Sequence, residues 1–130
     1  MSCRPALRGS LNLDTHILLH ALAGTLKPAE RRLLADDFWS ISAIVRWEIC
    51  KLRQLGRIEI DLDAPDVLRV LNRVETLPLT WEICRTSCRL DVRGDPADEL
   101  IAESSIVHNM LLVTRDKALR RSKLVPLAQF

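Results

Sequence analysis

The chain has 130 residues, of which 48% are hydrophobic and 28% are charged, a size and composition typical of one folded domain and not of a disordered chain. Its net charge of +2 is too small to indicate nucleic-acid binding by itself. No segment approaches the roughly 20 apolar residues of a membrane span, and the first ten residues lack the apolar core of a signal peptide. We therefore expect a cytoplasmic protein that does not enter the membrane.

Short apolar runs alternate with helical patterns along the whole chain. In order, we expect a strand ending at residue 14, helices at 16–22 and 29–35, a strand at 38–41, a helix at 43–55, an extended stretch at 58–62, a helix at 65–74, a short strand or extended segment at 77–79, helices at 81–90 and 96–108, a strand at 111–114, a short basic helix, and a strand at 125–127. Thr15, Ser42 and Thr80 are the expected helix caps. This alternation predicts an α/β domain with a mostly parallel sheet of about four to five strands, flanked by helices on both faces.

The four cysteines are Cys3, Cys50, Cys84 and Cys88, and they contain no Cys-x-x-Cys pair. In a reducing cytoplasm such thiols are expected to behave as small buried hydrophobic side chains. A metal or redox role is the less favoured alternative.

Two aspartates stand at the ends of apolar runs. Asp14 closes the run 11–13, and Asp116 follows the run 111–114 after one arginine. Ligand sites in parallel α/β sheets gather at the carboxyl ends of the strands, so both acids could reach one crevice. The alternative is that each is only a turn or helix-cap residue, positions at which aspartate is common.

A third acid, Glu48, lies on an apolar helix face. Ile44, Leu52 and Leu55 surround it at helical spacing. Burying a carboxylate there costs several kcal/mol unless it is paired or bound to a metal. An ion pair with Lys51, one turn away, is the structural alternative.

The fourth acid, Asp98, lies in the first turn of the helix that Asp95 and Pro96 open. Its spacing places it on the same face as Ile101, Ala102 and Ser105, which suggests that it points inward. A capping-box role toward Asp95 is its structural alternative. We interpret Asp95 first as the cap and second as a residue that supports the site.

Three or four converging carboxylates are typical ligands of Mg²⁺ or Mn²⁺, which supply a hydroxide nucleophile and stabilise charge during phosphodiester hydrolysis. The pattern therefore predicts a metal-dependent nuclease. His16 and His20 have the i, i+4 spacing of a zinc site, but the glutamate of a His-Glu-x-x-His motif is absent. A magnesium-dependent phosphatase is also disfavoured, because no Asp-x-Asp motif follows the first strand.

Five segments in order resemble the PIN-domain ribonuclease toxins of the VapC family: Leu13-Asp14-Thr15-His16, Ile41-Ser42-Ala43 through Glu48-Ile49, Leu77-Pro78-Leu79-Thr80, Gly94-Asp95-Pro96-Ala97-Asp98, and Leu112-Val113-Thr114-Arg115-Asp116. The resemblance covers 11–127 as a single PIN domain, preceded by an N-terminal extension at 1–10. It implies an endoribonuclease that uses Mg²⁺ or Mn²⁺, with Asp14, Glu48, Asp98 and Asp116 as the acidic quartet. Thr114 matches a polar position that supports the site. The resemblance also implies a homodimer that is silenced by a VapB-like antitoxin.

Four cations near these motifs are candidate RNA contacts: Arg46, Lys51, Arg115 and Lys117. The alternative for the basic segment 115–123 is a solvated face. The chain departs from the family where Asn12 replaces an apolar strand residue, since a buried amide needs partners, and where Glu99 replaces a common arginine. These departures leave a second hypothesis open, a catalytically degenerate PIN domain that binds protein or RNA.

Overall fold

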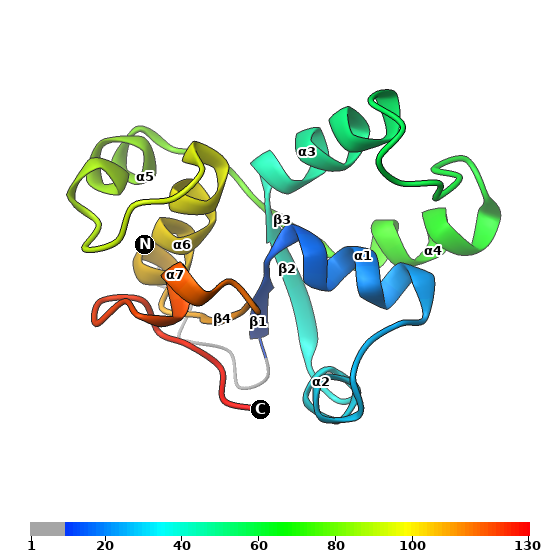
Figure 1. Ribbon diagram of the computed structural model, residues 1–130, viewed down its shortest axis with the longest axis horizontal. Helices are drawn as coiled ribbons and strands as arrows, with labels where there is room; N and C mark the ends of the chain where they lie inside the picture. Colours follow the sequence, from blue (N-terminus) through cyan, green and yellow to red (C-terminus); the bar gives the residue numbers. More distant parts are fainter. Residues whose placement is uncertain (1–9) are drawn as a thin grey trace.

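The computed structural model describes residues 10–130, which form a four-stranded parallel sheet with helices on both faces (Figure 1). The strands are β1 (Ser10–Leu13), β2 (Phe38–Ser42), β3 (Glu75–Leu77) and β4 (Leu111–Val113). The helices are α1 (Thr15–Ala23), α2 (Pro28–Leu34), α3 (Ala43–Gln54), α4 (Pro65–Arg73), α5 (Trp81–Thr86), the 3₁₀ turn η1 (Ser87–Arg89), α6 (Pro96–His108) and α7 (Lys117–Arg120). The predicted fold class is confirmed.

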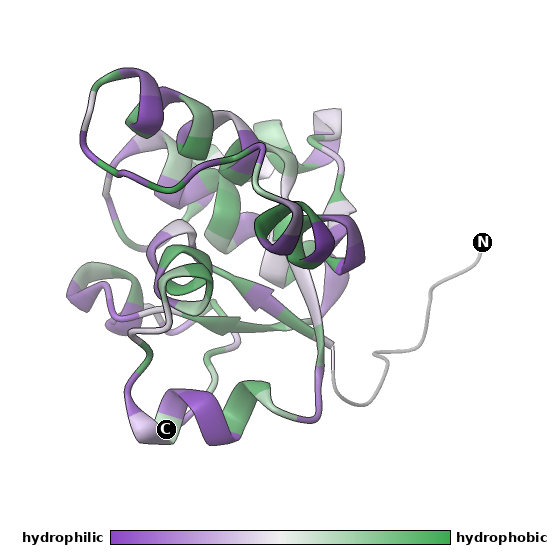
Figure 2. Cartoon of the chain, turned by 90° about the vertical axis from the view of Figure 1, so that its right-hand side faces the viewer, coloured by the Kyte–Doolittle hydropathy of each residue, from purple (hydrophilic) through white to green (hydrophobic). Residues whose placement is uncertain are grey.

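The strand order is β3-β2-β1-β4, and every pairing is parallel. Figure 1 shows α5, α6 and α7 on one side of the strands and α1, α3 and α4 on the other. Because both faces are covered, β1 is buried along its whole length. Hydrophobic and hydrophilic segments alternate along most helices (Figure 2), as expected for helices that cover a sheet with one face.

Two of the predicted helix caps, Ser42 and Thr80, are confirmed by their side-chain hydrogen bonds. The Ser42 side chain accepts a hydrogen bond from Ile44 N, and the Thr80 hydroxyl accepts one from Ile83 N. At α1, however, Asp14 and not Thr15 is the cap, and its carboxylate accepts from Thr15 N. The Thr15 hydroxyl is therefore available for another partner.

The stretch expected to be extended, 58–62, lies in an irregular loop, and its apolar side chains pack on the core. Other expectations at the margins of the sheet were wrong. The last expected strand is reduced to one isolated bridge between Leu112 and Leu127. Phe38, expected in a buried strand, is 75% exposed because β2 begins at the edge of the molecule. An apolar run in the sequence predicts that a segment packs on the core, but it does not predict whether a neighbouring strand is there to pair with it.

The cysteine prediction was correct only in part. Cys50, Cys84 and Cys88 are free thiols, but Cys50 and Cys88 are exposed and Cys84 is only half-buried. Cys3 and residues 1–9 of the predicted extension lie outside the described residues, and Ser10 is the first residue of β1. No helix within residues 10–130 combines the length and the apolarity that crossing a membrane requires.

Asn12, in the middle of β1, finds partners on α6. Its side-chain amide donates to the Ile101 carbonyl at 3.0 Å and to Ser105 Oγ at 2.9 Å, while its own Oδ1 has no partner within the described residues. The buried amide therefore fastens the central strand to the helix that carries Asp98.

Replacing Ser105 by alanine should destabilise the fold by about 1–3 kcal/mol, because one N–H of the fully buried Asn12 amide loses its acceptor. Ser104→Ala is the matched control. Ser104 is equally buried but donates to the Leu100 carbonyl of its own helix, so its loss leaves no buried donor unpaired. Urea unfolding of both variants measures the difference. Equal destabilisation would contradict the role given to Asn12.

Candidate carboxylate site

Asp14 and Thr114 meet at the carboxyl ends of neighbouring strands. The register pairs Leu13 of β1 with Val113 of β4, so the next residue of each strand emerges at the same edge of the sheet. Thr114 Oγ1 donates to Asp14 Oδ2 at 2.6 Å, and Thr15 N donates to Asp14 Oδ1 at 2.8 Å. Asp14 is only 4% exposed. Both of its oxygens are thus oriented in a buried position.

Glu48, on α3, is joined to the same edge through Thr15, whose hydroxyl donates to Glu48 Oε1. The alternative of an ion pair with Lys51 is wrong, because Lys51 Nζ instead donates to Gln54 Oε1 at 2.8 Å and lies 5.8 Å from the centre of the Trp47 ring. Sequence reasoning gave Thr15 only a capping role. The position of Thr15, directly after Asp14 at the start of the helix, was the sequence feature that could have indicated a role in the site.

Asp98 makes no capping hydrogen bond. The neighbouring Glu99 instead accepts a hydrogen bond at 3.2 Å from the backbone N–H of Gly94, the residue before the cap. Asp95 occupies the cap position of α6 by its backbone, but its side chain makes no cap hydrogen bond. The structural alternative for Asp98 is therefore not realised, and its carboxylate is available to the site.

Asp116 combines a structural role with proximity to the other acids. Its carboxylate caps α7 by accepting from Leu119 N at 3.0 Å, and its backbone N–H donates to Thr114 Oγ1 at 3.0 Å. Thr114 thereby connects Asp116 with Asp14. Both aspartates are helix-cap residues, as the structural alternative predicted. A cap residue can also belong to a shared site.

Burial, together with neighbouring carboxylates, raises the pKa of Asp14, Glu48 and Asp98. Burial, followed by repulsion from Asp14, Asp116, Glu48 and Asp95, raises the pKa of Asp98 to about 7. Burial also raises the pKa of Asp14, although the hydrogen bond from Thr114 opposes the shift. The pKa of Glu48 is raised chiefly by burial and further by Asp14 and Asp95. Five carboxylates therefore share one region of negative potential.

The donor set fits a hard divalent cation. It consists of carboxylate and hydroxyl oxygens, and within residues 10–130 none of the five acids has a salt bridge that would neutralise it. In the described conformation, no group of three or more His, Cys, Asp or Glu side chains of this part of the chain is already arranged to hold a metal ion.

The two histidines do not form the zinc pair considered above. His16 is exposed, and both ring nitrogens of His20 are engaged, Nδ1 with Thr25 Oγ1 at 2.6 Å and Nε2 with Arg115 Nη1 at 3.0 Å. His20 thus lacks a free ring nitrogen for a metal.

The four cations proposed as RNA contacts differ in availability. Arg46 is bound to Thr76 Oγ1 at 2.6 Å, Lys51 to Gln54, and Arg115 to Glu30 through a salt bridge of 2.6 Å. Lys117 is exposed and makes no side-chain hydrogen bond or ion pair with a described residue. It is the one of the four whose charge is not engaged by another described side chain.

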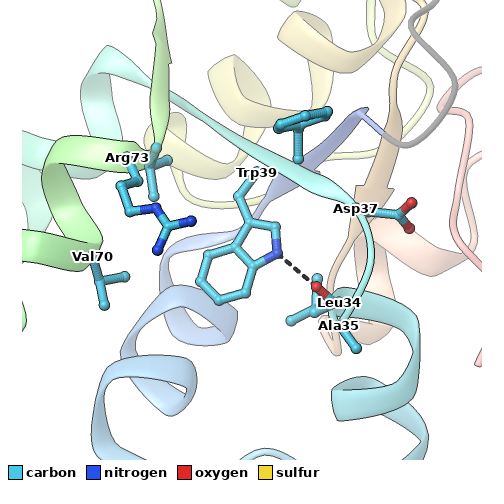
Figure 3. A pocket seen from close by; sticks show the side chains of 8 residues that line it. Leu34, Ala35, Asp37, Trp39, Val70 and Arg73 are labelled. Atoms are coloured by element: carbon cyan, nitrogen blue, oxygen red, sulfur yellow. Dashed lines mark hydrogen bonds between the residues drawn. The ribbon is translucent and has the colours of Figure 1, made fainter.

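A pocket of about 250 Å³ lies away from these acids, between the end of α2, the start of β2, and α4 (Figure 3). Trp39 crosses it, with Nε1 donating to the Leu34 carbonyl at 3.0 Å, and Arg73 lies beside its ring. The pocket is at the amino end of β2, whereas the acids are at the carboxyl ends of the strands. It is not part of the carboxylate site.

Residues 12–123 match the PIN domain family, and the chain belongs to that family. It is 34% identical over 89 residues to ribonuclease VapC22 of Mycobacterium tuberculosis, covering 66% of this chain and 68% of the relative. Among solved structures it is similar to VapBC2 of Rickettsia felis bound to a promoter DNA fragment, with a TM-score of 0.70 and 22% identity over 92% of this chain and 97% of that chain. A toxin–antitoxin complex of Klebsiella pneumoniae matches with a TM-score of 0.70 and 16% identity over 92% and 96% of the two chains. At these identities the two structures support the fold alone.

Proposed function

We propose that the chain is a cytoplasmic, divalent-metal-dependent endoribonuclease and the toxin of a toxin–antitoxin pair. The observation that carries this proposal is the repulsion of Asp98 by Asp14, Asp116 and Glu48 near the carboxyl ends of the strands in a PIN domain, where none of these acids has a salt bridge to a described residue. The similarity to a protein named ribonuclease VapC22 supports the same activity.

The four acids would hold Mg²⁺ or Mn²⁺, with Asp95 in the outer part of the site. When bound, such a metal supplies a hydroxide nucleophile and stabilises the charge on the phosphodiester. Thr114 and Thr15 orient Asp14 and Glu48 through their hydroxyl protons. This fixed orientation lowers the cost of ordering the site when substrate binds. Lys117, exposed one residue after Asp116, is the strongest candidate to contact an RNA phosphate.

A VapB-like antitoxin is the proposed partner, because the solved structures that share this fold include toxin–antitoxin complexes. We also propose a homodimer, which rests only on the family resemblance. The second candidate function is a degenerate PIN domain that binds RNA or protein without cleaving it. The amide of Asn12 in the central strand motivated this alternative, but that amide is paired with α6 and does not disturb the strand end that carries Asp14.

Incubation of the purified chain with an unstructured RNA tests the proposal. We expect cleavage in Mg²⁺, loss of cleavage in excess EDTA, and recovery when Mn²⁺ is added, because a carboxylate site prefers hard cations. Gel analysis of the RNA ends measures all three conditions. Recovery by Zn²⁺ alone would contradict the assigned site, and RNA binding without cleavage in any metal would favour the degenerate domain.

A further inference from the structure

Glu30, on α2, is a fully buried carboxylate outside the acidic cluster. Its Oε1 accepts from Arg115 Nη2 at 2.6 Å and its Oε2 accepts from Arg115 Nε at 2.7 Å, which makes the pair two-pronged. Lys27 N also donates to Oε1 at 2.8 Å. A buried carboxylate with this many charge-assisted partners holds the arginine in one position.

Arg115 is the residue between Thr114 and Asp116. Its guanidinium also donates through Nη1 to His20 Nε2 at 3.0 Å. Because a guanidinium can only donate, Nε2 must accept and the ring proton lies on Nδ1, which donates to Thr25 Oγ1. The arginine therefore joins α1, α2 and the segment after β4.

The contact between Glu30 and Arg115 opposes an electrostatic repulsion within the carboxylate site. Asp14 and Asp116 repel each other, and both repel Asp98. That repulsion favours movement of the β4–α7 segment away from β1, against the strand pairing and the hydrogen bond from Thr114 to Asp14. Glu30 contacts Arg115, which lies 85 residues later in the sequence, between Thr114 and Asp116. The contact therefore opposes this movement.

We propose that Glu30, acting through Arg115 and supported by His20, is a positioning residue of the ribonuclease site. It holds residues 114–116 against β1 so that Thr114 and Asp116 stay beside Asp14. This inference rests on the proposed function. It assigns Arg115 to the architecture of the site and not to RNA binding, and Glu30 touches neither substrate nor metal.

Glu30→Gln and Arg115→Lys test the proposal, because the first keeps the size of the side chain, the second keeps its charge, and each removes the two-pronged charged contact. In both variants we expect Mn²⁺ affinity, measured by titration calorimetry, to fall about 10–100-fold. The kcat for RNA cleavage should fall by a similar factor, with KM changed less than about threefold. Arg85→Gln, which removes an exposed arginine from α5, is the control and should leave all three quantities unchanged.

Hydrogen–deuterium exchange, at a temperature where circular dichroism shows the variants folded, separates positioning from general destabilisation. We expect faster exchange at residues 114–120 and unchanged exchange in α4. Wild-type Mn²⁺ affinity in Glu30→Gln, or a raised KM with unchanged kcat in Arg115→Lys, would overturn the positioning role while leaving the proposed function intact. Exchange that rises equally throughout the chain would also overturn it. Failure of the wild-type chain to bind Mn²⁺ would overturn the proposed function, and this inference with it.

Discussion

Asp98→Asn should abolish RNA cleavage while making the metal-free protein more stable at pH 8. The variant keeps the shape of the side chain and removes the charge that four neighbouring carboxylates repel. Loss of an outer-shell partner of a metal site costs about 10–100-fold in activity, so loss of a proposed direct ligand should cost at least about 100-fold. Cleavage assays in Mg²⁺ and thermal unfolding in EDTA measure the two effects.

Glu99→Gln is the matched control for Asp98→Asn. It removes the same charge one position further along α6, from a residue that only accepts a hydrogen bond from Gly94 N, and a glutamine oxygen can accept it equally well. We expect cleavage by this variant to remain close to the wild-type rate. If Asp98→Asn also retained cleavage, the carboxylate would have no part in the reaction.

The stability of the metal-free protein should fall as the pH rises from 5 to 8. The pKa of Asp98 is about 7 in the folded chain, against an ordinary value of 3.8. Between these values the folded state binds more protons than the unfolded state, so the free energy of unfolding decreases with pH and levels off above about 7. The raised pKa values of Asp14 and Glu48 act in the same direction.

Metal binding should show the opposite dependence on pH, because the cation competes with the proton for these carboxylates. With a pKa of about 7, only about a tenth of Asp98 side chains are ionised at pH 6, so apparent Mn²⁺ affinity should rise up to about pH 7 and then level off. Thermal unfolding of the wild type and of Asp98→Asn, across this pH range with EDTA or Mn²⁺, measures both effects. Parallel curves for the two proteins would contradict the role of Asp98.

The sequence predicted the fold well where local chemistry decides it. The apolar strands around residues 11–13 and 111–113, the caps at Ser42 and Thr80, and the proline starts of α4 and α6 all depend on neighbouring residues. The last strand, near Leu127, was not predictable in this way, because a strand also needs a partner over several residues.

The acids were identifiable because a carboxylate on an apolar face or at a strand end is chemically conspicuous. Their supporting contacts were not. The Thr15 hydroxyl could equally have been a local cap, and only the packing of α1 beside α3 directs it to Glu48. Arg115 resembled part of a solvated basic strip, since its partner Glu30 is distant in sequence and is buried only after α2 has docked.

Titration calorimetry of the metal-free chain with Mn²⁺ at pH 8 tests the central claim most directly. At that pH the Asp98 carboxylate is mostly ionised, since its pKa is about 7, and the site should show saturable binding that raises the unfolding temperature. Asp98→Asn should lose most of that binding, whereas Glu99→Gln should keep it. Absence of saturable binding to the wild type, or equal binding by the wild type and Asp98→Asn, would contradict a metal site built from these carboxylates.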